Sequence, residues 1–173
     1  MESSQSSGVG VIMNNNYGNI AIGDDAGNRQ LRGILSFSTA SLPDNAIIQS
    51  AVLKIKSQQY TGQDPFVAFN NLWADMDQGS FGTTALELSD FNETADGAAI
   101  GAFNKTPVSG WYSLTLSDAG RDLVNLLPGS TQFRLHFNPG DNNNNTADFM
   151  QFYSGDSVAT GTQPQLIITY TLP

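Results

Sequence analysis

Four basic side chains lie in positions that favour binding of an anionic ligand. Lys54 and Lys56 alternate with apolar residues in the stretch "SAVLKIKS". Arg134 and His136 do the same in "TQFRLHFN". Successive side chains of a strand point to opposite faces, so these four should face solvent. If the two strands pair, the four side chains form one basic stripe, in which an arginine fork matches the carboxylate of an acidic sugar. The alternative is ordinary charge that protects sheet edges.

Two tryptophans are candidates for contact with a sugar ring. In "GWYSLTLS", Trp111 shares a face with Ser113 and Thr115, so it is expected outside the core. Trp73 ends another predicted strand, at the start of a long acidic connection. Flat aromatic surfaces bind the apolar faces of ligands, and nearby polar groups fix their orientation. The alternative for Trp111 is burial in a small satellite cluster under a loop.

One asparagine-rich loop has the spacing of oxygen donors that suits calcium. The stretch "GDNNNNTAD" contains Asp141, Asn143, Asn145 and Asp148. It lacks the glycine and the closing glutamate of an EF-hand, so we expect at most one structural calcium of another kind. The alternative is a turn in which asparagines adopt left-handed conformations. With one histidine and no cysteine, transition-metal sites are disfavoured.

The sequence offers little for catalysis. A Ser-His-Asp triad would need His136, the single histidine, but this residue lies mid-strand beside Arg134, whose charge disfavours protonation. Carboxylates are frequent between Asp75 and Asp96, and a glycoside-hydrolase pair would have to come from them. Acidic loop residues are mostly solvated, so we predict that the protein is not an enzyme. A polysaccharide lyase or hydrolase is the alternative.

Short apolar runs separated by turn residues predict an all-β protein, an antiparallel jelly-roll-like β-sandwich. The clearest strand is 49–60, in which Ala51, Leu53 and Ile55 should face the core. One short helix is predicted over 117–129, with Ser117 as its N-cap. The other expected strands cover residues 9–13, 20–23, 31–38, 66–73, 111–117, 131–138, 148–154 and 164–172.

Length and charge limit the remaining possibilities. We expect a flexible lead-in over residues 1–8 and a single domain over 9–173. The net charge of −9 argues against nucleic acid as a partner, because too few cations are present to neutralise phosphates. No apolar run approaches the roughly 20 residues that cross a bilayer, so membrane insertion is not expected.

Four stretches resemble, in the same order, the DNRLRE family of extracellular β-domains: "NNNYGNIAIGD", "NRQLRGILSFSTASLPDNAIIQSAVLKI", "GWYSLTLSDAGRDLVN" and "FYSGDSVATGTQPQLIITYTL". The stretch "GNRQLRG" matches loosely the motif that gives the family its name. The resemblance implies a jelly-roll-like module of large secreted or surface proteins, related to modules that bind alginate-type polysaccharides. The middle of the chain lacks the Trp-Thr-containing segment that many relatives carry.

These observations lead to one expectation and one alternative. We expect a non-catalytic carbohydrate-binding module for an acidic polysaccharide, located outside the cell or at its surface as part of a larger multidomain protein. The alternative is a structural or adhesive module of an extracellular stalk, surface layer or fibre that has no soluble ligand.

Overall fold

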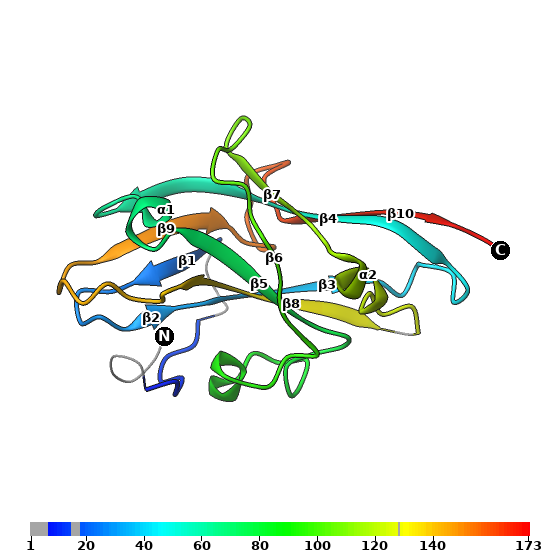
Figure 1. Cartoon of the computed structure of the whole chain (residues 1–173), viewed down its shortest axis with the longest axis horizontal. Helices are drawn as coiled ribbons and strands as arrows, with labels where there is room; N and C mark the ends of the chain where they lie inside the picture. Colours follow the sequence, from blue (N-terminus) through cyan, green and yellow to red (C-terminus); the bar gives the residue numbers. More distant parts are fainter. Residues whose placement is uncertain (1–6, 15–17, 128) are drawn as a thin grey trace.

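In the computed structural model, which describes residues 7–14, 18–127 and 129–173, the chain forms two antiparallel sheets stacked on one core (Figure 1). The order of the first sheet is β10-β4-β9-β1-β2, with β7 also paired to β4. The order of the second sheet is β3-β8-β5-β6. The prediction of an all-β, antiparallel sandwich is therefore confirmed.

The first sheet comprises β1 (Asn19–Asp24), β2 (Gln30–Leu31), β4 (Ile47–Thr61), β7 (Trp111–Thr115), β9 (Asp148–Tyr153) and β10 (Gln165–Thr171). The second sheet comprises β3 (Gly33–Ser38), β5 (Asn71–Asp77), β6 (Gly97–Ala102) and β8 (Ser130–Asn138). The prolines, glycines and asparagines between these strands form the connections, because they suit turn conformations that strands exclude.

The core forms where the alternating apolar faces of the two sheets meet. From the first sheet, Leu53 and Ile55 of β4 are fully buried. From the second, Phe133 and Leu135 of β8 are equally inaccessible. Burial of each such side chain stabilises the fold by about 1.5–3 kcal/mol. The period-two prediction of inward-facing residues is confirmed for both strands.

Strand β4 organises the first sheet. Residues 52–54 of β4 pair with both β10 and β7, so those two strands lie on opposite edges of it. Further along, Ser57 still donates its N–H to Gly110 on the β7 edge (2.9 Å) and pairs with Phe152 of β9. Strand β9 therefore continues the edge on which β10 lies. This arrangement places the ends of β7 and β9 on either side of the middle of β4.

The predicted helix exists but is short. Helix α2 (Asp118–Asp122) begins after Ser117, whose Oγ accepts a hydrogen bond from Gly120 N (3.2 Å) as expected for an N-cap. The chain then turns so that Val124 packs in the core, and Asn125 N donates to Thr131 Oγ1 (3.0 Å). No helix in the described parts of the chain has the length and apolar character needed to cross a membrane.

The predicted strand 66–73 is wrong in its first half. Residues Pro65–Ala68 form helix α1, because Asp64 Oδ1 accepts a hydrogen bond from Phe66 N (2.9 Å) and Pro65 occupies the first helical turn. Asn70 then takes a positive φ of 77° and redirects the chain into β5. Local cap chemistry outweighed the apolar alternation.

The predicted strand 9–13 is also wrong. These residues form no strand, and Val9, Ile12 and Met13 are more than half exposed (58, 54 and 55%). A Cβ on Gly10 would lie 2.2 Å from Leu88 O, so the chain here passes against the connection between β5 and β6. Most of the expected lead-in, residues 1–6, lies outside the described residues.

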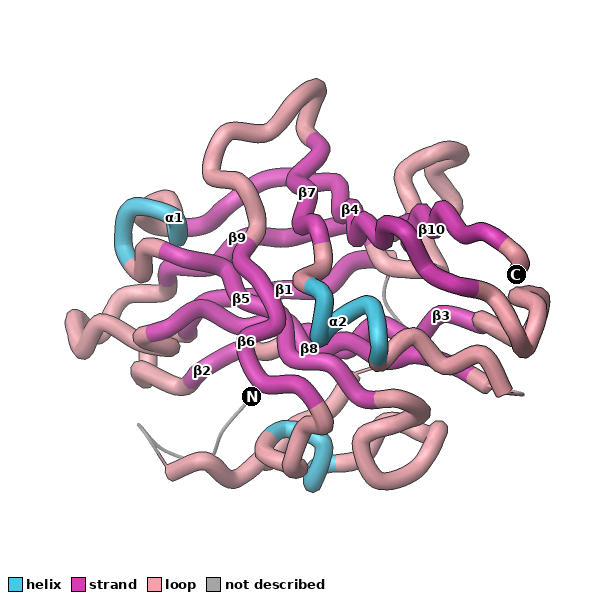
Figure 2. The backbone as a smooth tube through the Cα atoms, turned by 45° about the vertical axis from the view of Figure 1, so that its right-hand side comes forward, coloured by secondary structure: helices cyan, strands magenta, loops and turns pink. Residues whose placement is uncertain are grey.

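The connection between β5 and β6 lies on the side of the second sheet that faces away from the first (Figures 1 and 2). It contains one short 3-10 helix, η1 (Leu88–Phe91). Strand β6, which follows, was not predicted, because its glycines and alanines have low strand propensity.

The two faces of β4 should differ in their tolerance of substitution. We expect Leu53→Ala to lower the free energy of unfolding by about 2–5 kcal/mol, because it leaves a cavity between the sheets. The neighbouring Val52 points away from the core, so Val52→Thr should lower the free energy of unfolding by less than about 1 kcal/mol. Urea denaturation followed by circular dichroism measures both. Equal losses would show that the two sheets are not stacked on this face.

Candidate functional site

A tryptophan and two lysines meet on the outer face of the first sheet. Trp111 and Lys56 are direct partners across the β7–β4 pair. The Lys54 Nζ lies 5.1 Å and the Lys56 Nζ 5.7 Å from the centre of a Trp111 ring. Both distances lie within the range of a cation–π interaction. Three of the residues that the sequence predicted as ligand-binding are therefore in contact.

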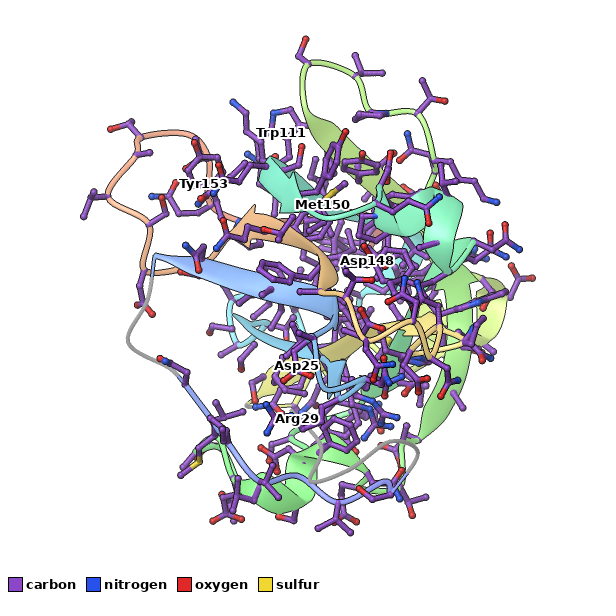
Figure 3. The ribbon with its side chains drawn as sticks, turned by 90° about the vertical axis from the view of Figure 1, so that its left-hand side faces the viewer. Asp25, Arg29, Trp111, Asp148, Met150 and Tyr153 are labelled. Atoms are coloured by element: carbon purple, nitrogen blue, oxygen red, sulfur yellow. The ribbon has the colours of Figure 1, made fainter. Side chains whose placement is uncertain are left out.

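A tyrosine completes the row from the other edge of β4. Phe152 of β9 pairs with Ser57 and is fully buried, so Tyr153, the next residue, faces outward beside Lys56. Figure 3 shows Trp111 and Tyr153 on the same side of the sheet, with Met150 beneath it. Neighbouring strands lie about 4.8 Å apart, so the row is roughly 10 Å wide.

We call Trp111, Lys54, Lys56 and Tyr153 the tryptophan–lysine site. Sequence analysis missed Tyr153, although the alternation in "DFMQFYS" carries the signal, since Met150 and Phe152 face inward.

Uncharged polar groups surround the tryptophan–lysine site. Ser113 and Gln165 are the cross-strand partners of Lys54 on its two edges. Further along the same face, Gln59 Nε2 donates to Gln151 Oε1 (2.8 Å). Hydroxyl and amide groups of this kind can donate to and accept from sugar hydroxyls.

The positive charge of the site is not neutralised by neighbouring carboxylates. Neither Lys54 nor Lys56 forms a salt bridge with any residue in the described ranges. The chain has only seven basic residues against sixteen acidic ones, so two adjacent lysines without a carboxylate partner form a local exception. An anionic group is the ligand that such a pair can bind most favourably.

The prediction of one continuous basic stripe is wrong, because Arg134 belongs to the other sheet. Strand β8 pairs with β3 and β5, not with β4. Arg134 faces away from the core as expected but is only 5% exposed, because the β5–β6 connection covers it. Its Nε and Nη2 lie 3.0 and 2.7 Å from Asp75 Oδ2, and its Nη1 donates to the carbonyls of Asp90 (3.0 Å) and Glu93 (2.7 Å). Arg134 therefore holds the connection and is not free for a ligand.

His136 and Trp73 are also separated from Trp111. They are cross-strand partners on the outer face of the second sheet, which lies on the opposite side of the sandwich. The His136 Nε2 lies 3.3 Å from Asp75 Oδ1, and its Nδ1 lies 3.3 Å from the carbonyl of Phe137. These contacts give His136 structural partners on both ring nitrogens.

Asp75 is the carboxylate on which this covered face depends. Burial raises the pKa of Asp75, but hydrogen bonds from His136, Ala99 N–H and Arg134, together with the charge of His136, outweigh it. The pKa of Asp75 therefore lies well below its ordinary value. Asp90 differs, because burial and the charges of Glu87 and Glu93 raise its pKa despite a hydrogen bond from Glu87 N.

The asparagine-rich loop is held by amide groups. Asp148 Oδ1 accepts from Gln63 N (2.6 Å), and its Oδ2 accepts from the side-chain amides of Asn142 (2.8 Å) and Asn144 (3.0 Å). Asn143 and Asn145 have φ of 60° and 58°, as the turn alternative predicted.

The oxygens of this loop do not fit a calcium site as they stand. Both oxygens of Asp148 accept from N–H donors, and Asn145 Oδ1 accepts from Asn28 Nδ2 (3.0 Å). Within residues 7–14, 18–127 and 129–173, no group of three or more His, Cys, Asp or Glu side chains is suited to a metal. Calcium binding at Asp141, Asn143, Asn145 and Asp148 stays a prediction that requires these hydrogen bonds to exchange.

No protein-family model and no curated protein matches this sequence.

The ion pair of Asp75 should make stability depend on pH. The pKa of Asp75 is lowered by folding, so its contribution is present above the unfolded value of about 3.9 and is lost as the pH falls towards the folded value. We expect Asp75→Asn to lower the free energy of unfolding by about 3 kcal/mol at pH 7. The deficit relative to wild type should shrink below about pH 4.

The matched control is Asp118→Asn. The Asp118 side chain is 93% exposed and pairs with Arg121 on the surface, so its loss should cost less than about 1 kcal/mol at any pH. Urea titrations at several pH values measure both variants. A deficit for Asp75→Asn that stays constant down to pH 3 would contradict the assigned ion pair.

Proposed function

We propose that this domain is a non-catalytic carbohydrate-binding module for an acidic polysaccharide, and that the tryptophan–lysine site binds it. The observation that supports this most is the contact of two lysines without carboxylate partners with Trp111 on an outward sheet face. A uronic acid presents an apolar ring face and a carboxylate together, and the site offers a partner for each.

The aromatic and the charged groups of the site would contact different parts of the sugar. The rings of Trp111 and Tyr153 offer apolar surface to the sugar rings. Lys54 and Lys56 lie two residues apart on β4, about 7 Å along the strand, and their ammonium groups can each pair with a carboxylate. At physiological salt the Debye length is about 8 Å, so these lysines act locally while the more distant acidic groups are screened.

The proposal is of binding without turnover. The single histidine of the chain, His136, contacts Asp75 and a backbone carbonyl on the opposite side of the sandwich from Trp111. The resemblance of the sequence to extracellular β-domains supports the same ligand class, a location outside the cell or at its surface, and a place in a larger multidomain protein.

A structural or adhesive module is the second candidate, and one surface supports it. Four apolar side chains are exposed at the start of β4, along the edge strand β10 and just after it: Ile47 (51%), Ile167 (48%), Tyr170 (39%) and Leu172 (57%). Exposed apolar residues along a sheet edge suit contact with a neighbouring domain. Self-association in sedimentation experiments, without retention by any polysaccharide, would support this alternative.

Affinity electrophoresis in gels that contain alginate, pectin or a neutral β-glucan tests the proposal. The wild-type protein should be retarded by a polyuronate. Trp111→Ala should weaken this binding about tenfold, equivalent to about 1.4 kcal/mol, because the ring surface is lost. Lys54→Gln should weaken binding to the polyuronate but not to a neutral glucan.

The matched control is Arg121→Gln, which removes the same charge from α2, where its partner is Asp118. It should leave retardation unchanged. Failure of all three polysaccharides to retard the wild-type protein would overturn the proposal, as would equal effects of Lys54→Gln and Arg121→Gln.

A further inference from the structure

A second candidate binding region lies on the side of the sandwich where β1 and β3 run. A cavity of about 760 Å³ opens there between the two sheets. Its walls come from β1, β3, the segment around residues 10–14, residues 84–91 of the β5–β6 connection, and residues 154–156 after β9. Its size falls in the range of ligand-binding cavities. None of the four residues of the tryptophan–lysine site lines it.

Strand β3 presents its backbone edge to this cavity. The five consecutive residues 33–37 all line it. Because neighbouring side chains of a strand point to opposite faces, five consecutive lining residues mean that the strand edge itself forms the wall. Strand β3 pairs with β8 on one edge only, and no backbone hydrogen bond joins residues 33–37 to another described segment. Alternate N–H and C=O groups of β3 therefore face the cavity.

Strand β1 presents a second open edge. Residues 19–21 line the same cavity, and on that side of β1 its partner β2 reaches only Gly23 and Asp24. The two sheets approach each other at the bottom of the cavity, where a Cβ on Gly33 would lie 3.2 Å from Ile20 Cδ1. We call this region, bounded by β1 (19–21) and β3 (33–37), the sheet-edge cleft. Figure 3 shows residues 7–14 lying beside the β5–β6 connection.

The lining of the cleft is mainly apolar, and two acidic residues lie at its rim. Ile12, Ile34 and Leu88 line its walls. Glu87 and Asp156, both exposed, lie at the rim. A peptide strand with apolar side chains and a basic residue would complement this surface, whereas a sugar chain would find no tryptophan among the lining residues.

Two further lining residues are charged, one basic and one acidic. Arg32 is engaged, since its guanidinium lies 4.1 Å from the centre of the Phe91 ring and donates to the Phe91 carbonyl. Asp90 is only 2% exposed, and its Oδ1 is the one fully buried side-chain oxygen or nitrogen that lacks a hydrogen-bond partner among the described residues.

We propose that the sheet-edge cleft binds an extended peptide segment of a partner protein, which pairs with β3 as an added strand. In this segment apolar side chains alternate with polar ones, because every second side chain would enter the cleft. It carries a lysine or arginine near Glu87 and Asp156, because the rim is acidic. About five residues span the roughly 17 Å of β3 at 3.3–3.4 Å each.

A second copy of this chain fits the cleft less well. The chain carries a net charge of −9, so two copies repel each other, and the acidic rim adds to that repulsion. The inference does not depend on the proposed function, because the cleft and the tryptophan–lysine site share no residue.

Fluorescence anisotropy with a labelled peptide of alternating valine and threonine, with a lysine at each end, tests the proposal. We expect saturable binding in the anisotropy measurement. In a separate hydrogen-exchange measurement, the bound peptide should slow amide exchange of the protein only at residues 33–37 and their neighbours. A peptide that is N-methylated on alternate amides should not bind, because it cannot form the ladder. A peptide with glutamate at both ends should bind at least about tenfold more weakly, equivalent to about 1.4 kcal/mol.

Matched variants locate the binding surface. The double substitution Glu87→Gln and Asp156→Asn should weaken binding of the lysine-ended peptide about fivefold or more. The control is Glu93→Gln with Asp118→Asn, which removes the same charge from exposed positions outside the cleft and should change nothing. Trp111→Ala should bind the peptide as the wild type does, which separates this inference from the proposed function.

Three results would overturn the proposal. The first is absence of binding by the lysine-ended peptide, or binding that N-methylation does not affect. The second is slowed exchange at residues 33–37 caused by an oligouronate and not by the peptide. The third is a dimer in sedimentation that protects these amides without peptide, which would assign the cleft to a second copy of the chain.

Discussion

The buried ion pair between Arg134 and Asp75 determines which outer face of the sandwich is covered. Each sheet uses one face for the core. On the second sheet the other face is covered by the β5–β6 connection, which Arg134 holds through the carbonyls of Asp90 and Glu93. On the first sheet Trp111, Lys54 and their neighbours stay on the outer face. The protein thus has one outer face covered by the β5–β6 connection and one that carries Trp111 and Lys54.

Period-two alternation was sufficient to predict which way the side chains of β4, β7 and β8 point. Leu53 and Phe133 are in the core, and Lys54 and Trp111 are outside it, because pleating fixes these directions locally. Alternation does not tell whether an outward side chain meets solvent. Arg134 points outward as predicted but is buried, because a segment more than 40 residues away in the sequence covers it.

The remaining errors came from strand pairing and local caps. Residues 9–13 have the composition of a strand, yet a strand needs a partner edge, and the chain passes instead against Leu88. The pair Asp64 and Pro65 carried a helix-start signal that the apolar pattern of 66–73 concealed. The alternation predicted that Lys54 and Trp111 each point outward. It did not predict that they form one site, because the pairing of β4 with β7 is a property of the whole topology.

The chain has only two tryptophans, one on each outer face, and this permits one direct measurement of where a glycan binds. In a nitrogen-labelled sample each indole N–H gives its own signal in a two-dimensional NMR spectrum. During titration with an oligouronate, the account predicts that the Trp111 signal shifts in a saturable way while the Trp73 signal stays in place. A shift of Trp73 alone, or no shift of either signal at saturating glycan, would contradict it.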